Sequence, residues 1–166
     1  WMAAAAPKRM VHLGELPDDV RERHAALSPL WLKPFGGFSR EEEQTSQINK
    51  NGDTTFDNFG WIVEAKLNPG QLDAFREVMN SQVERAKTEP GTLNYQYYMS
   101  DDGDIMVYER FRDLEASHIH IQNWDDHAER WIAAATPTRM VHLGDLPKEL
   151  TDKHAALSPL LLKPLG

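Results

Sequence analysis

The sequence predicts an α+β domain in which a four-stranded antiparallel sheet carries two helices on one face. Three observations predict it: apolar residues that alternate as in strands, two long helical stripes, and a turn signal between successive patterns. In chain order the patterns give strand, helix, strand, strand, helix, strand. That order is the ferredoxin-like split βαβ arrangement.

The first half of the pattern is a strand followed by a helix. Phe59–Leu67 alternates apolar and polar residues, as a half-buried strand does. Apolar residues then recur at helical spacing from Leu72 to Ala86. Asn68–Gly70 turns the chain into this helix. Glu89–Gly91 ends it, because proline cannot continue a helix and glycine allows a left-handed turn.

The second half begins with a hairpin. Thr92–Ser100 and Asp104–Phe111 read as its strands, and the Asp-Asp-Gly sequence between them is a hairpin turn signal. The elements expected after it are a long helix capped by Asp113 and running to about Ala135, a strand over Thr138–Gly144, a short helix over Pro147–Leu157 and an extended segment over Ser158–Gly166.

An internal repeat divides the chain. Residues 1–36 align without a gap to residues 131–166, with 24 identities in 36 positions. Such a match indicates a duplicated domain. The expected organisation is residues 1–40 as the C-terminal part of an upstream copy, residues 41–57 as an acidic polar linker, and residues 58–166 as the complete domain. The first part has no sheet of its own, so we expect it to dock on the complete domain or on another chain.

Composition narrows the classes of partner. A net charge of −8 argues against nucleic acid, since phosphate binding needs a basic surface. No apolar run approaches the ~20 residues that span a bilayer, and no cysteine is present. Disulfides, thiolate nucleophiles and cysteine-ligated zinc are therefore excluded. We expect a cytoplasmic protein with neither a membrane nor a nucleic acid as partner.

The second long helix carries the most unusual pattern. One of its faces has serine, histidine and tryptophan at spacings of three and four: Ser117, His120, Trp124, His127 and Trp131. This face is interpreted as a pocket wall, with rings to hold a flat ligand and a histidine to move a proton near neutral pH. The alternative is that the tryptophans only pack and the histidines are satisfied or solvent-facing.

The histidines do not predict a metal site. His120 and His127 are seven residues apart, or ~10 Å along a helix, which is too far to share one ion. His142 lies in the last predicted strand, which could point it into the pocket, although a structural role is the alternative.

Several short motifs resemble the antibiotic biosynthesis monooxygenase-like family over about Phe59 to Gly144. They are Glu-Arg-Ala-Lys-Thr-Glu-Pro-Gly-Thr at 84–92, Tyr95, Tyr-Glu-Arg-Phe-Arg-Asp at 108–113, and then His120. Members of that family are small dimeric α+β barrels. The resemblance therefore implies a dimeric or tandem α+β barrel here.

The resemblance also implies an activity, the oxidation of a small quinol or phenolic aromatic by O2 with no metal and no organic cofactor. His120 would be the catalytic base or hydrogen-bond donor. The substrate contacts expected around it are Trp124, His127, Tyr95, Trp131 and His142. The alternative is a non-catalytic α+β barrel that binds a ligand or oligomerises.

A four-stranded sheet with helices on one side leaves its other face uncovered. Aromatic residues such as Trp61, Tyr95 or Tyr97 could be exposed there. An apolar face of that kind would favour a homo-oligomer that pairs sheet against sheet.

Overall fold

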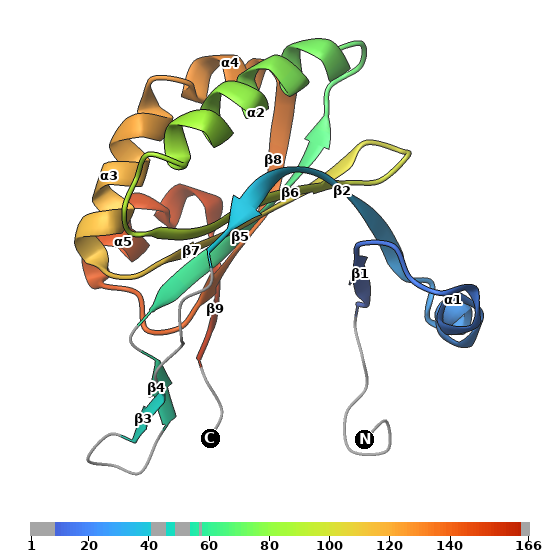
Figure 1. The fold of residues 1–166 in the computed structure, drawn as a ribbon, viewed down its shortest axis with the longest axis horizontal. Coiled ribbons are helices and arrows are strands. Elements are labelled where there is room, and N and C mark those ends of the chain that lie inside the picture. Colours follow the sequence, from blue (N-terminus) through green and yellow to red (C-terminus); the bar gives the residue numbers. More distant parts are fainter. Residues whose placement is uncertain (1–8, 41–45, 49–53, 57, 164–166) are drawn as a thin grey trace.

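The computed structural model describes residues 9–40, 46–48, 54–56 and 58–163. Its centre is the predicted α+β arrangement, an antiparallel sheet with helices over one face (Figure 1). The central strands are β5 (Phe59–Leu67), β6 (Thr92–Met99), β7 (Asp104–Phe111) and β8 (Ala135–Leu143). They lie in the order β6-β7-β5-β8, so the ferredoxin-like prediction is confirmed.

Three helices cover one face of this sheet, namely α2 (Leu72–Ala86), α3 (Leu114–Asp125) and α4 (Ala128–Ala134) (Figure 1). Asp113 caps α3 as predicted, since its carboxylate accepts the backbone N–H of Ala116 at 2.8 Å.

The prediction of one unbroken helix from Asp113 to about Ala135 is wrong. At the break between α3 and α4, the backbone N–H of His127 bonds to the carbonyl of Trp124, three residues back, at 2.8 Å. The His127 ring meanwhile bonds to the carbonyl of Asn123, the acceptor that a continuing α-helix would use.

The two copies of the repeat fold alike. The first copy forms β1 (Val11–Leu13), α1 (Asp18–His24), a 3-10 turn (Ala25–Leu27) and β2 (Leu30–Ser39), and the second forms β8, α5 (Lys148–Lys153), a 3-10 turn (Ala155–Leu157) and β9 (Leu160–Leu162). In each copy the two strands are parallel. Val11 lies opposite Leu30 and Val141 opposite Leu160, which is the same register.

The first copy docks on the complete domain, as expected. β2 pairs antiparallel with β6, from Lys33 opposite Met99 to Ser39 opposite Asn94. The sheet therefore has seven strands in the order β1-β2-β6-β7-β5-β8-β9. Leu32 of β2 is only 1% exposed, whereas its repeat counterpart Leu162 in β9 is 45% exposed. Equivalent residues of the two copies thus differ in burial.

The predicted linker contains two short strands. β3 (Ser46–Ile48) and β4 (Thr54–Phe56) pair with each other in antiparallel fashion. The remaining linker residues, 41–45, 49–53 and 57, lie outside the described residues.

The expected exposure of Trp61, Tyr95 and Tyr97 is wrong. They are 3%, 1% and 1% exposed, because the strand alternation turns them toward the helices. The opposite face of β5 instead carries Glu64, whose carboxylate pairs with Arg139 at 3.3 Å and with Arg9. These arginines occupy equivalent positions in the two repeats, so both copies converge on one carboxylate.

The repeat supplies a matched stability test. Leu150 of α5 is fully buried in a cluster with Trp61 and Phe111, whereas its counterpart Val20 in α1 is only half-buried. We expect Leu150→Ala to lower the free energy of unfolding by ~2–5 kcal/mol, because it leaves a cavity. Val20→Ala should cost less than ~1 kcal/mol. Denaturant unfolding measures both values, and equal losses would contradict the different burial of the two tails.

Candidate functional site

A cavity of about 310 Å³ lies between the helix-covered face of the sheet, the helices α3 and α4, and the segment around α5. Its volume is that of a pocket for a small organic molecule. Aromatic walls come from Trp61, Tyr97, Trp124 and Trp131, and the polar or charged lining residues include Glu109, His120, Asp125, Lys153 and His154. The site is thus mostly apolar with a few polar groups.

His120 is held between two carboxylates. Its Nδ1 lies 2.8 Å from Oε2 of Glu89, and its Nε2 lies 3.2 Å from Oε2 of Glu109. All three side chains are buried, with His120 only 4% exposed. The contact to Glu109 has an ion-pair distance without the alignment of a hydrogen bond. The Nε2–H of His120 therefore remains available to hydrogen-bond a ligand, whereas the Nδ1–H is bonded to Glu89.

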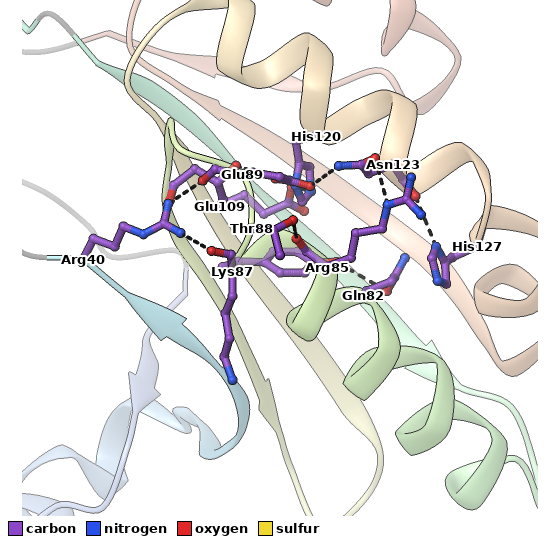
Figure 2. Close-up of polar contacts among 12 residues, drawn as sticks. Arg40, Gln82, Arg85, Lys87, Thr88, Glu89, Glu109, His120, Asn123 and His127 are labelled. Atoms are coloured by element: carbon purple, nitrogen blue, oxygen red, sulfur yellow. Dashed lines mark hydrogen bonds and ion pairs between the residues drawn. The ribbon is translucent and has the colours of Figure 1, made fainter.

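Glu89 is fixed by three donors, two from α3 and one from β6. It lies in the turn that follows α2, where its Oε2 accepts from His120 and from the Thr92 hydroxyl at 2.6 Å. Its Oε1 accepts from the Asn123 amide at 2.7 Å (Figure 2). Burial alone would raise the pKa of Glu89, but the hydrogen bonds and the charge of His120 outweigh it and lower the pKa.

The two carboxylates keep His120 protonated. Burial alone would lower the pKa of His120, but the close contact with Glu109, the hydrogen bond to Glu89 and the charges of both carboxylates raise it to about 9. At neutral pH the ring is therefore an imidazolium, in which both nitrogens are donors. The group that faces the cavity is a cationic donor beside a carboxylate.

A second histidine pair borders the same cavity. Nε2 of His142 lies 3.0 Å from Nδ1 of His154, and His154 lines the cavity. Burial, followed by the charges of His142 and Lys153, lowers the pKa of His154 to about 4, so this ring is neutral at pH 7.

The hydrogen positions in this pair follow from the hydrogen-bond network. Nδ1 of His142 is buried without a partner among the described residues, so the hydrogen of His142 is assigned to Nε2. His142 then donates to Nδ1 of His154, and the hydrogen of His154 is left on its own Nε2. His154 thereby keeps one donor on the side of its ring away from His142.

Three of the predicted site residues, His120, Trp124 and Trp131, line the cavity. Tyr95 lies behind His120, with ring centroids 4.8 Å apart, and its hydroxyl bonds to that of Tyr97 at 2.6 Å.

The other two predicted residues lie farther from the cavity. His127 is not among the cavity-lining residues and bonds to the Ser81 hydroxyl at 3.0 Å. His142 reaches the cavity only through His154.

Sequence reasoning did not single out Glu89, Glu109, Asn123 or His154 as site residues. Glu109 carried a signal, because it occupies an inward position of β7 between buried Val107 and Phe111, where a charge demands a partner. His154 carried one as well. The spacing of 12 residues to His142 recurs between His12 and His24, which also contact each other, at 3.1 Å.

The part of the chain that the structure describes holds no group of three or more acidic or histidine side chains arranged to bind a metal ion. Within the same residues, no helix is long and apolar enough to cross a membrane.

The ion cluster makes a pH prediction. The pKa of folded His120, about 9, lies above its ordinary 6.5. The contribution of the charged His120 to the stability of the folded state is therefore complete below pH 6.5 and is lost as the pH rises through about 9. Glu89→Gln removes one charge and should lower the pKa of His120 by about one unit or more. NMR titration of the imidazole protons measures this shift. Glu84→Gln is the control, because Glu84 is exposed near the end of α2, the helix that precedes Glu89. This variant should leave the titration of His120 unchanged. A variant at Glu89 that titrates like wild type would contradict the cluster.

Two solved structures are similar to this chain. MupZ from Pseudomonas fluorescens aligns with a TM-score of 0.57 at 18% identity, over 66% of this chain and 91% of its own. Rv0793 from Mycobacterium tuberculosis aligns with a TM-score of 0.48 at 21% identity, over 55% and 97%. The likeness to MupZ shows the fold alone. Among curated proteins, none matches this chain.

The family comparison covers the central domain. Residues 59–134 match the model of the antibiotic biosynthesis monooxygenase family, a span that runs from β5 to the end of α4 and includes Glu89, Glu109 and His120. Residues 59–134 of this chain therefore form a domain of the antibiotic biosynthesis monooxygenase family.

Proposed function

We propose that this chain oxidises a small quinol or phenolic aromatic with O2, without a metal or an organic cofactor. The observation that carries the proposal is the buried Glu89–His120–Glu109 cluster, which meets an aromatic-walled cavity of about 310 Å³. Family membership supports the reaction class, and the volume and aromatic lining support a small flat substrate.

The cluster contains a base and an acid side by side. The carboxylate of Glu109 is placed to accept the proton of a substrate hydroxyl, which leaves an electron-rich phenolate. His120, already protonated, cannot act as the base in this state. Its Nε2–H is instead the donor for negative charge that develops on oxygen.

The reaction balances without a further reagent. A phenol with a ring C–H gives a quinone, because one oxygen atom of O2 bonds to that carbon and the other leaves as water with two substrate hydrogens. The phenolate supplies the electrons that reduce O2 and forms a peroxide at the ring carbon. His120 donates a proton to the outer oxygen of this peroxide. The O–O bond then breaks while the ring C–H bond breaks to form the new C=O, and the proton from that carbon joins the departing hydroxide as water. Glu109 returns the phenol proton to the imidazole.

Two further donors are suited to orient the substrate. The indole N–H of Trp131 is buried and makes no well-aligned hydrogen bond among the described residues, although the Tyr97 hydroxyl lies near it. His154 keeps its Nε2–H on the far side of the pair with His142. A ligand that carries acceptor oxygens at its rim would satisfy both, which favours phenols and quinones over hydrocarbons.

Oxygen uptake tests the assignment. Glu109→Gln and His120→Asn should each lower kcat/KM for a quinol by roughly 10²-fold or more, as the loss of a general base or acid does. His118→Gln, a partly exposed histidine on the same helix, is the matched control and should retain full turnover. Wild-type rates in both site variants would rule out the cluster as the reacting groups. Binding of the aromatic by wild type without any uptake would favour the alternative, a ligand-binding module.

We further infer that the tail of one copy can dock on the β6 edge of another copy when that edge is free. Leu160, Leu161 and Leu162 of β9 are 45%, 56% and 45% exposed, whereas β2, the equivalent strand of the first repeat, continues past Leu32 into the pairing with β6. In the docked copy, Leu30–Leu32 pair with β1, and the residues from Lys33 onward pair with β6. The edge of a β6-type strand is therefore the surface against which such a tail can dock. In this chain that edge is filled by β2, so the tail that contains β9 can dock only on a copy from which β2 has been displaced.

Freeing the β6 edge should therefore convert the chain into a dimer. Gly37 has φ +116°, and a Cβ there would lie 2.1 Å from the carbonyl oxygen of Tyr95, so Gly37→Ala should expel β2 from β6. Sedimentation velocity should show a dimer for Gly37→Ala and a monomer once Leu162→Lys is added. Gly14→Ala, also at positive φ but with no atom within 4 Å, is the control and should stay monomeric. A folded Gly37→Ala variant that remains monomeric would refute this mode of assembly.

A further inference from the structure

The first tail reaches the candidate site through its last described residue. Arg40 follows β2, and its backbone N–H bonds to the carbonyl of Leu93 at 2.7 Å, which continues the strand pairing to the start of β6. Its side chain is half-buried and turns under the loop between α2 and β6 (Figure 2).

The guanidinium of Arg40 binds three carbonyls of that loop. Nη1 donates to the carbonyls of Glu89 at 2.5 Å and Thr92 at 2.6 Å, and Nη2 donates to that of Lys87 at 2.6 Å. Three carbonyl dipoles directed at one point repel one another unless a cation lies between them. The planar fork of arginine satisfies all three at once, which a single ammonium group does less well.

The same loop carries Glu89 on its inner side. The backbone carbonyl of Glu89 faces Arg40, while its carboxylate faces His120 and Asn123, so one residue joins the clamp to the ion cluster (Figure 2). A displacement of this backbone would move the carboxylate away from Nδ1 of His120. Backbone bonds satisfy the N–H groups of this turn, from Thr88 to the carbonyl of Arg85 and from Glu89 to that of Ala86. Its carbonyls are instead held by arginine side chains, those of Lys87 and Glu89 by Arg40 and that of Pro90 by Arg112.

We propose that Arg40 is a positioning residue for the candidate site, and that the tail of one domain copy thereby sets the geometry of His120 in the next copy. Arg40 lies just beyond the segment that repeats the end of the complete domain, so the clamp comes from outside residues 59–134. On this proposal the tail positions residues of the neighbouring site and is not merely a by-product of duplication.

Two other contacts of the tail with the domain lie at the far end of the pairing with β6 or on α2. Lys33, at the opposite end of the pairing with β6, forms an exposed ion pair with Asp101 at 2.8 Å. Phe35 packs beside Phe75 and under Arg76 of α2. These contacts hold the tail but touch neither Glu89 nor His120. They therefore allow a test that separates positioning from general adhesion.

The experiment compares Arg40→Ala with Lys33→Ala in the full chain. Arg40→Ala should lower the pKa of His120, as read by NMR, and should reduce kcat/KM roughly tenfold or more, since a displacement of about 1 Å at a reacting group is that costly. Arg40→Lys should fall between this variant and wild type, and added guanidinium ion should partly restore Arg40→Ala. Lys33→Ala should leave both readouts at wild-type values.

The outcomes separate this inference from the proposed oxidation, on which only its activity readout rests. If no quinol is turned over, the titration of His120 still reports the clamp. An unchanged His120 titration in Arg40→Ala would overturn the proposal, as would an equal change in Lys33→Ala. Should Arg40→Ala not fold, the same comparison is made with Arg40→Lys, where an unshifted titration of His120 would contradict the proposal in the same way.

Discussion

The structure depends on one buried cation between two buried anions. An imidazolium in an apolar core would lose its proton unless opposite charge stood beside it, and Glu89 and Glu109 supply that charge at 2.8 and 3.2 Å. The cluster carries a net charge of −1, so the surplus has to be spread over neutral donors. Thr92 and Asn123 supply them to Glu89, and Glu109 is left at the cavity. The distribution of these donors leaves the less saturated carboxylate where a substrate would sit.

This requirement connects distant parts of the fold. Glu89 belongs to the turn after α2, Glu109 to β7 and His120 to α3, so the cluster forms only when the helix lies across the sheet at the correct height. Asn123, one helical turn beyond His120, bonds to the same carboxylate and also accepts from Arg85 of α2 at 2.8 Å. The site and the helix packing therefore stabilise each other. Loss of one of these contacts would therefore disturb both the site and the packing of α3 against α2.

Sequence alone predicted the elements whose pattern is local and missed those that depend on tertiary contacts. The alternation of Phe59–Leu67 and the stripe of α2 needed no partner to be recognised. The break at His127 did need one, because it depends on a ring that takes over a backbone carbonyl. Likewise, His120 stood out as a residue type, but its charge state is set by carboxylates 31 and 11 positions away. Spacing along a helix carries no information about those partners.

The two histidine pairs of the repeat also show that tertiary surroundings cannot be read from a local pattern. His142 and His154 contact each other as His12 and His24 do, so the sequence of the tail determines its local geometry. Their surroundings differ: the ring of His154 lies edge-on to Trp61 beside the cavity, whereas that of its counterpart His24 stacks on His12. Burial holds the pKa of His154 near 4, while carboxylates hold that of His120 near 9. Two histidines on one cavity are thus kept in opposite charge states across the neutral range, and only their surroundings distinguish the neutral ring from the cationic donor.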